Sequence, residues 1–556
     1  MNANHPDSAS HGDLRAAVED LSRRLKIVEA RLGIREAERA AEVRVPELSE
    51  APPAVGASER DSLEFELGQN WFALIGIVVL AIGLAFLISL PYPEFPSYLP
   101  SLGGYLLCGV ILVLARLVRH SFETIAKYLR GAVMLLLFFA TLRLCYFGRP
   151  SALDPASTTG EVIFLAVVVM NLLLAWFRRS PQLLVLAMVT GFAAALAVGT
   201  PLFFLGVCTA MILVAAYAQL ARQWRVMSPL VFALAMVSYV IWAIGNPLDG
   251  NPLLVRTDPL FSTQLILLWV VVLSVVTMAR EDSRIEDTPV QVTGLLLCGL
   301  GFLGFTLHSL FGFQESFLFN ELLAFVVFLV LGLVFWIREQ SVFSTFLYSM
   351  TGYAALSLAL IKGFGVPEVF VALSLQSLVV IGTAIFFRSR FIIVANCLIF
   401  IGIIIGYMAL TREELGMSIG FGIVALISAR VLNWQKDRLA LQTDLMRIVY
   451  LVIAFLVFPY ALYYLVPSSF VAVSWAGLAL FYYAMNLVIR NPRYRWMGHA
   501  TLLLTVLYVA FVGTRQMESR YRILSFLFLG TVMLVVSIVF TSIRARHRRE
   551  EKGEEE

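Results

Sequence analysis

The sequence predicts an all-α fold: a polytopic helical membrane bundle of about 18 transmembrane helices, preceded by a short N-terminal coiled-coil helix. Three observations lead to this prediction. The 556-residue chain is 59% hydrophobic and 14% charged, whereas soluble domains carry about 25% charged residues. Apolar runs of about twenty residues recur from residue 71 onwards. Basic residues gather in alternate loops between these runs. Lipid is therefore the expected solvent for most of the chain.

Residues 1–33 are predicted to form a cytoplasmic coiled-coil helix. Apolar residues there repeat at alternating spacings of four and three, which gives the seam Leu14, Val18, Leu21, Leu25, Val28 and Leu32. A helix this short is marginal by itself, so we expect it to pair with a second copy of the chain or with another protein. A helix that lies on the surface of the rest of the chain is the alternative.

Residues 34–70 are predicted to be a flexible linker and a juxtamembrane helix. The linker lacks apolar periodicity and is rich in Ala, Glu, Arg and Pro, a composition that cannot bury a core. The acidic stretch Glu64–Glu66 and the interfacial residue Trp71 then lead into the first apolar run. Residues 71–543 form the multi-span membrane domain, and residues 544–556 form a charged cytoplasmic tail.

The spans follow from the length of the apolar runs, because a helix that rises 1.5 Å per residue crosses about 30 Å of hydrocarbon in about twenty residues. The predicted ranges are 71–90, 99–118, 128–147, 160–177, 182–199, 202–221, 227–245, 259–278, 290–311, 318–337, 342–361, 367–387, 391–410, 416–433, 447–466, 469–489, 496–513 and 522–543.

The loop charges predict the orientation of these spans. Alternate loops from Arg116 to Arg495 carry Arg and Lys, and the tail Arg544–Arg549 is basic as well. Because cytoplasmic loops hold the excess of basic residues, both termini are expected on the cytoplasmic side. The loop that contains Arg515 and Arg520 is the exception. Short loops place neighbouring spans in antiparallel hairpins, and the pair Gly402 and Gly406 predicts a close helix contact.

The chain resembles an uncharacterised bacterial family of predicted polytopic membrane proteins, a domain of unknown function. The resemblance rests on the N-terminal coiled coil, on the entry Glu64–Gly76, on Lys127–Gly131 and Tyr146, and on Arg178–Pro181, Thr190–Phe192 and Trp224–Arg225. The family often has a doubled Gly and a Pro in the fifth span, where this chain has Thr190-Gly191 and Ala193–Ala195. The resemblance covers the first half of the chain and implies a bacterial inner-membrane location, without an activity.

A first group of candidate functional residues consists of ionisable or polar side chains near the outer ends of spans. A charge at the bilayer centre costs about 2.5–3.5 kcal/mol, so these residues are a candidate intramembrane polar site: Arg143, His308, Glu315, Asn320 and Glu321. In one interpretation Arg143 pairs with Glu315, Glu321 or a substrate anion, and His308 relays protons with Glu321. In the other, Arg143 reaches the outer headgroups, and His308 is a structural residue bonded to a neighbouring carbonyl group.

A second group consists of amide side chains in the middle of spans, and these are candidates for lining a path through the membrane domain: Asn171, Gln376, Asn396 and Asn486. Such residues also serve as hydrogen-bonding contacts between helices, each worth about 0.6–2 kcal/mol. Both roles stay open.

The sequence gives no support for soluble-type catalysis or for nucleic-acid binding. It contains no Walker loop and no G-x-S-x-G, H-E-x-x-H or EF-hand pattern. The cysteines Cys108, Cys145, Cys208, Cys298 and Cys397 lie in apolar segments without C-x-x-C spacing, so neither a disulfide framework nor a metal site is expected. No cofactor is expected either.

Three functions remain as hypotheses. In the first, the bundle transports or shelters a small neutral or amphipathic solute, because the spans carry few charges. In the second, the protein is a structural or regulatory membrane scaffold that recruits a partner through its coiled coil. In the third, it is a membrane-embedded transferase acting on lipid-linked substrates, with Asp154, Asp249, Asp258 or Glu321 as the carboxylate.

Overall fold

The computed structural model describes residues 72–90, 96–120, 123–147, 151–279, 288–339, 341–410, 419–435, 444–489, 491–513, 523 and 525–536. The coiled-coil seam of residues 1–33 lies outside these ranges and stays a prediction. The chain divides into two units, Met1–Ile75 and Gly76–Glu556, and only the second is described extensively. Regular structure in the described residues is helical throughout, as the sequence predicts.

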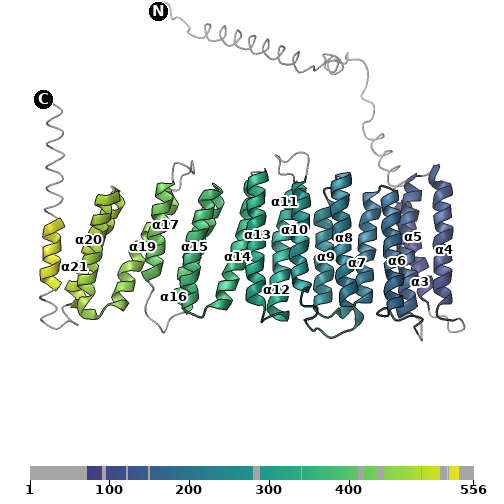
Figure 1. Cartoon of the computed structure of the whole chain (residues 1–556), viewed down its shortest axis with the longest axis horizontal. Coiled ribbons are helices and arrows are strands. Elements are labelled where there is room, and N and C mark those ends of the chain that lie inside the picture. The colour runs from purple at the N-terminus through teal and green to yellow at the C-terminus, as the bar shows by residue number, and fades with distance from the viewer. Residues whose placement is uncertain are drawn as a thin grey trace, which may run out of the picture. The chain divides into compact units, whose positions relative to one another are not determined.

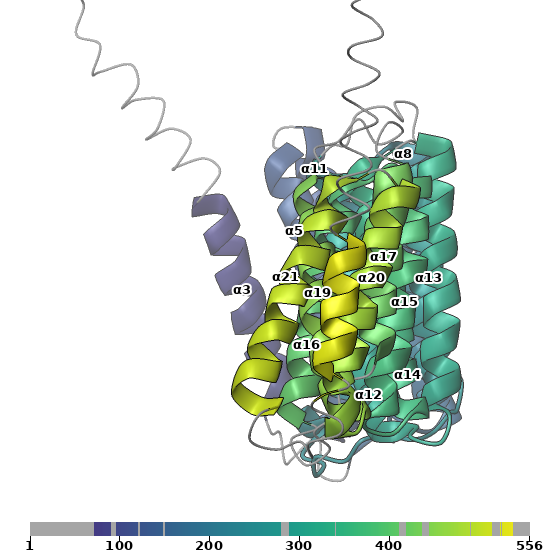
Figure 2. The ribbon, with the colours of Figure 1, turned by 90° about the vertical axis from the view of Figure 1, so that its left-hand side faces the viewer.

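The helices are α3 (Phe72–Ser89), α4 (Leu99–Leu117), α5 (Glu123–Tyr146), α6 (Thr158–Phe177), α7 (Pro181–Val198), α8 (Pro201–Arg222), α9 (Met227–Ala243), α10 (Ser262–Met278), α11 (Thr288–Leu296), α12 (Phe302–Gly312), α13 (Phe317–Glu339), α14 (Val342–Gly363), α15 (Glu368–Phe386), α16 (Arg390–Leu410), α17 (Ile419–Trp434), α19 (Asp444–Leu465), α20 (Val471–Ile489) and α21 (Pro492–Tyr508). Figures 1 and 2 show neighbouring helices of the second unit side by side, with their axes close to parallel.

Thirteen helices of the described residues are long and apolar enough to cross a membrane. One of these combines α11 and α12, which join through a π-helical turn into the span Thr288–Gly312. Five shorter apolar helices accompany them: Val79–Ile88, Met227–Ala243, Ser262–Met278, Ile419–Trp434 and Ser525–Val536. Every range predicted as a span up to residue 513 contains a helix, which is the arrangement of a multi-pass membrane protein.

Local sequence explains where these helices begin and end. Ser157, Ser180 and Ser341 are N-caps whose hydroxyl groups accept a hydrogen bond from a backbone N–H in the first turn. Pro at the first helical position needs no N–H partner, and Pro201 fills that position in α8. Gly199 ends α7 with φ = 69°, a left-handed conformation that glycine adopts without strain.

Glycine also determines the closest helix pair of the bundle, α13 and α14. A Cβ atom on Gly352 of α14 would lie 3.2 Å from the Leu329 nitrogen and 3.2 Å from the Phe325 oxygen, both backbone atoms of α13. On α13, a Cβ atom at Gly332 would lie 2.7 Å from the Ser349 hydroxyl. Gly402 has nothing within 4 Å of that position, whereas a Cβ atom at Gly406 would lie 3.2 Å from a ring carbon of Phe370 on α15; the predicted pair thus has a close contact at Gly406 alone, with a side chain. The backbones approach at Gly332 and Gly352 instead.

Two large apolar clusters lie on either side of this helix pair. The first runs from α5 to α14 and includes Trp242, Trp269 and Phe328. The second runs from α14 to α21 and includes Tyr353, Phe400 and Tyr450. Polar side chains in either cluster must therefore find partners within the protein, because lipid offers none.

Candidate functional site

A cavity of about 410 Å³ lies between the middle turns of α14, α15 and α16. Its lining is mainly apolar and includes Met350, Leu358, Leu373, Val380, Ile399 and Ile403. Five side chains with hydrogen-bonding groups interrupt the apolar lining: Tyr353 and Ser357 from α14, Gln376 and Ser377 from α15, and Asn396 from α16. All five are neutral. We call this the amide cavity, after Gln376 and Asn396.

Hydrogen bonds hold Gln376 at the boundary between α14 and α15. Its Nε2 atom donates to the Tyr353 carbonyl oxygen at 2.8 Å and to the Ser357 hydroxyl at 3.1 Å. The Ser357 hydroxyl lies 2.8 Å from the same carbonyl oxygen and 3.2 Å from the Gln376 Oε1 atom. The Tyr353 hydroxyl donates to the Thr383 hydroxyl at 2.8 Å. The wall of the amide cavity is therefore pre-formed.

Asn396 joins α16 to two other helices through its nitrogen atom alone. Its Nδ2 atom donates to the Ser377 hydroxyl at 2.8 Å and to the Tyr450 hydroxyl at 3.0 Å. A longer bond of 3.3 Å reaches the Ser377 carbonyl oxygen. Its Oδ1 atom accepts no hydrogen bond from the described residues. Asn396 thus offers an acceptor on the cavity wall, where a bound solute could donate a hydrogen bond.

The sequence singled out Gln376 and Asn396 as path-lining candidates, and both line this cavity. The other two amides do not. Asn171 is buried and donates to the Met134 carbonyl oxygen at 3.3 Å and to the Thr190 hydroxyl at 3.1 Å, which ties α6 to α5 and α7. Asn486 is half-buried on α20. The structure therefore separates the four amides into two on the cavity and two elsewhere.

A second polar group surrounds His308 on α12. The His308 Nε2 atom lies 2.8 Å from the Arg256 carbonyl oxygen, and its Nδ1 atom lies 2.6 Å from the Tyr239 hydroxyl. A carbonyl oxygen can only accept, so Nε2 carries the hydrogen and Nδ1 accepts from the tyrosine. Both ring nitrogens are therefore occupied. His308 holds the loop that contains Arg256 against α9, which is the structural role the sequence left open.

Arg256 secures the same loop on its other side. Its Nη1 atom donates to the Gly199 carbonyl oxygen at 3.3 Å, at the turn between α7 and α8. The guanidinium group lies 5.2 Å from the centre of the Trp242 ring, within the range of a cation–π contact. Neither Arg256 nor Tyr239 stood out in the sequence. Only the folded chain brings them to His308.

Asn320 and Glu321 are neighbours on α13 and are both fully buried. Asn320 donates to the Ser309 hydroxyl at 2.8 Å, and its amide meets that of Gln264 at 2.9 Å. Neither carboxyl oxygen of Glu321 makes a hydrogen bond of good geometry with the described residues, although the Thr306 hydroxyl is close enough to interact with it. A buried carboxyl group without a well-formed hydrogen bond is costly, so Glu321 is unfavourable for stability at this position.

The predicted site around Arg143 does not assemble. Arg143 is buried on α5, which packs against α4, α6 and α7, whereas α12 and α13 pack against each other and against α10. Its Nη1 atom donates to the Phe147 carbonyl oxygen at 3.4 Å. No ion pair joins Arg143 to Glu321 or to Glu315, which is exposed in the loop between α12 and α13. The described residues therefore do not show an Arg143–glutamate pair, and a substrate anion as the partner of Arg143 stays a prediction.

The four carboxylates proposed for transferase chemistry do not line the amide cavity. Asp154 is exposed and accepts a hydrogen bond from the Ala156 backbone N–H at 3.0 Å, a turn contact, and Asp258 is exposed. The described residues contain no group of three His, Cys, Asp or Glu side chains that could hold a metal ion. The amide cavity thus combines volume with neutral hydroxyl and amide groups, and no carboxylate, histidine, lysine or cysteine lines it.

Sequence reasoning missed Tyr353, Ser357 and Ser377. Serine and tyrosine occur often in apolar helices, where the hydroxyl group of Ser can bond to the preceding turn of its own helix. Their place on the cavity depends on the packing of α14 against α15 and α16, which the sequence pattern does not contain. Comparison with known proteins adds no assignment: no protein-family model, no curated protein and no solved structure shows a significant match to this chain.

Proposed function

We propose that the protein binds a small, neutral, hydrogen-bonding solute in the amide cavity and transports or shelters it within the membrane. The observation that carries this proposal is the lining itself. A volume of about 410 Å³ falls within the range of about 300–1,000 Å³ that is typical of small-molecule sites. The mixture of apolar walls with a few fixed polar groups is typical of such sites as well.

The absence of charge in the lining favours a neutral solute. A charged solute inside the bilayer needs an opposite charge or a metal ion to offset its desolvation, and every lining side chain is uncharged. The free acceptor at Asn396 Oδ1 favours a solute that carries a hydroxyl or amide N–H group. Apolar residues on the remaining wall favour a solute with a hydrocarbon portion.

The experiment compares neutral solutes with charged analogues of the same size. Purified protein in lipid nanodiscs is titrated with neutral polyols, amides and alcohols, and with the matching carboxylates and amines. Binding is followed by the shift of the unfolding temperature, and flux is measured in proteoliposomes. We expect neutral compounds alone to bind.

The variant Asn396→Leu removes the free acceptor and should abolish the binding, whereas Asn486→Leu, which changes an amide outside the cavity, should retain it. Equal binding by the charged analogues, or full binding by Asn396→Leu, contradicts the proposal.

We further propose that the membrane domain has about 18 spans in the bacterial inner membrane, with both termini in the cytoplasm. The loop charges support this arrangement, and α13 allows a direct test. Glu315 precedes α13 and Arg338 lies in its last turn, and both are exposed. Native cysteines do not interfere, because all five are buried. In intact cells, a membrane-impermeant maleimide should label Glu315→Cys and leave Arg338→Cys unlabelled; the reverse result inverts the orientation.

A further inference from the structure

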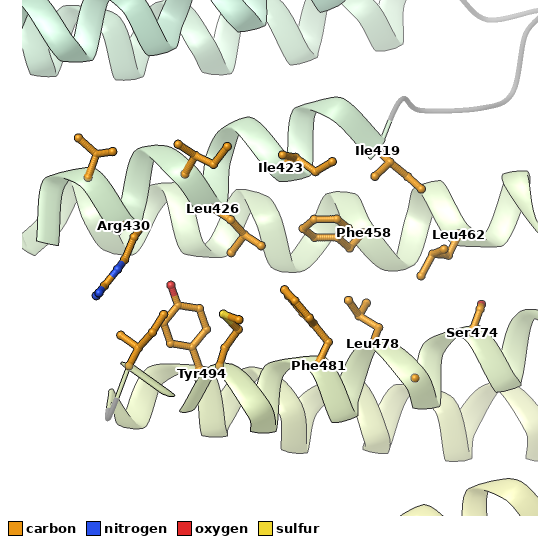
Figure 3. A pocket seen from close by; sticks show the side chains of 15 residues that line it. Ile419, Ile423, Leu426, Arg430, Phe458, Leu462, Ser474, Leu478, Phe481 and Tyr494 are labelled. Atoms are coloured by element: carbon orange, nitrogen blue, oxygen red, sulfur yellow. The ribbon is translucent and has the colours of Figure 1, made fainter. Parts of the chain in front are cut away.

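A second and larger pocket, of about 600 Å³, opens between two helix pairs near the end of the chain. Helices α17 and α19 pack closely together, as do α20 and α21, whereas contact between α19 and α20 is limited. The pocket lies between these pairs, and Figure 3 shows its lining side chains. The wall is apolar for most of its length and includes Ile423, Leu426, Phe458, Leu462, Leu478 and Phe481. We call this pocket the apolar groove.

One end of the apolar groove is cationic. Arg430 from α17 and Tyr494 from α21 both line it, and Figure 3 places them together, away from Ile419 and Ser474. The Arg430 side chain is exposed, and no carboxylate or carbonyl group of the described residues pairs with it. The positive charge of Arg447 is offset by the Asp444 carboxylate, which lies 2.8 Å away, and Arg447 also donates a hydrogen bond to Asn433. Arg430 therefore presents a guanidinium group that is free to bind an anion.

The length of the apolar groove matches one leaflet of a bilayer. The lining residues of α17 run from Ile419 to Val431, and the twelve residue steps between them correspond to about 18 Å of helix. That is roughly half of the ~30 Å hydrocarbon core. A groove of this length, apolar along the wall and cationic at the end, is complementary to an amphiphile with an anionic head.

Charge selects the occupant of the apolar groove. Arg430 is exposed and has no anionic partner among the described residues, and an anionic head group would offset its charge. The apolar wall would hold the attached hydrocarbon chain.

We propose that the apolar groove binds an anionic phospholipid, with an acyl chain along α17 and α20 and the phosphate group at Arg430. The guanidinium group supplies the charge and a planar pair of N–H donors that suit phosphate oxygens. The Tyr494 hydroxyl lies at the same end, where it can donate a further hydrogen bond. This inference is independent of the amide cavity, which lies between other helices.

The test measures lipid retention by native mass spectrometry of the full-length protein. Phosphatidylglycerol and phosphatidylcholine with identical chains are titrated separately. We expect tighter binding of phosphatidylglycerol, and about a fivefold loss of that affinity in Arg430→Gln, the effect of one basic charge at a membrane surface. Arg338→Gln removes an exposed arginine from the last turn of α13, outside the groove, and should bind as the wild type does.

A second variant tests the groove itself. Gly477 lines it, and a Cβ atom at this position would meet nothing within 4 Å, so Gly477→Leu should fold and fill the space. We expect it to lose binding of both lipids. Gly109→Leu is the matched control, because Gly109 on α4 is exposed and equally open. Equal affinity for both lipids in the wild type, or wild-type retention of phosphatidylglycerol by a folded Gly477→Leu, overturns the proposal.

Discussion

The Gln376 amide of α15 and the Ser357 hydroxyl of α14 lie 3.1 Å apart, and both bond to the Tyr353 carbonyl oxygen at 2.8 Å. Two side chains from different helices thus share one backbone acceptor at the wall of the amide cavity. Such bonds between helices satisfy polar groups that have no water to bond to inside a membrane. The cavity keeps its shape because its polar groups are hydrogen-bonded to each other. The lining side chains therefore lose less conformational entropy when a solute binds.

Gln376 should respond differently to an apolar and to an acidic replacement. Gln376→Leu removes the bonds to Ser357 and Tyr353, and we expect the free energy of unfolding to fall by about 1–2 kcal/mol. Gln376→Glu retains the shape but places a carboxyl group where the lining has no cation, so we expect a larger loss, of about 3 kcal/mol. Thermal unfolding in the same nanodiscs measures both. A glutamate variant as stable as the wild type would show that the cavity accepts a carboxyl group, and the expected loss would be wrong.

The helices of this protein could be predicted closely because lipid imposes a simple rule: about twenty apolar residues form a span. The last residues of α7 and the first of α8 were predicted well because Gly199, Thr200 and Pro201 mark that turn locally. Gln376 and Asn396 could be singled out because amides are rare in the middle of apolar runs. These signals all lie within one or two turns of the residue concerned.

Contacts between distant spans left no such signal. Arg143 and Glu321 seemed able to pair because both lie near outer span ends, yet their helices pack against different neighbours. Asn171 and Asn396 have the same chemistry and a similar place in their spans, but the first bonds to Thr190 and the second lines a cavity. Which helix faces which residue depends on the packing of the whole bundle, and a single sequence does not contain that information.

His308 is expected to contribute to stability rather than to proton transfer. His308→Phe removes the bonds to Tyr239 and to the Arg256 carbonyl oxygen and leaves a buried hydroxyl group unpaired, which should cost about 2–3 kcal/mol. Tyr239→Phe removes one bond and should cost about 0.5–1.5 kcal/mol. A double-mutant cycle checks the coupling. If both single variants retained wild-type unfolding temperatures, the structural role of His308 would be wrong.

Gly352 should tolerate no larger side chain. In Gly352→Ala the new methyl group meets backbone atoms of α13 at 3.2 Å, and backbone cannot turn aside as a side chain does, so the helices must separate. We expect a loss of about 1–3 kcal/mol. Gly402→Ala is the control, because a Cβ atom at Gly402 would have no neighbouring atom within 4 Å. Replacing glycine by alanine inside a helix raises the free energy of unfolding by up to about 1 kcal/mol. Equal stability of the two variants would mean that the α13–α14 contact adapts without cost.

Asn320 and Glu321 provide the sharpest comparison, because adjacent buried residues on one helix should give effects of opposite sign. Asn320→Leu breaks the bonds to Ser309 and Gln264, and we expect a loss of about 1–3 kcal/mol. Glu321→Met removes a carboxyl group that makes no hydrogen bond of good geometry with the described residues, and replaces it with an apolar chain of similar length. Stability should rise by about 1–3 kcal/mol. Chemical unfolding of both variants measures the sign. A free energy of unfolding of Glu321→Met at or below that of the wild type would contradict the prediction.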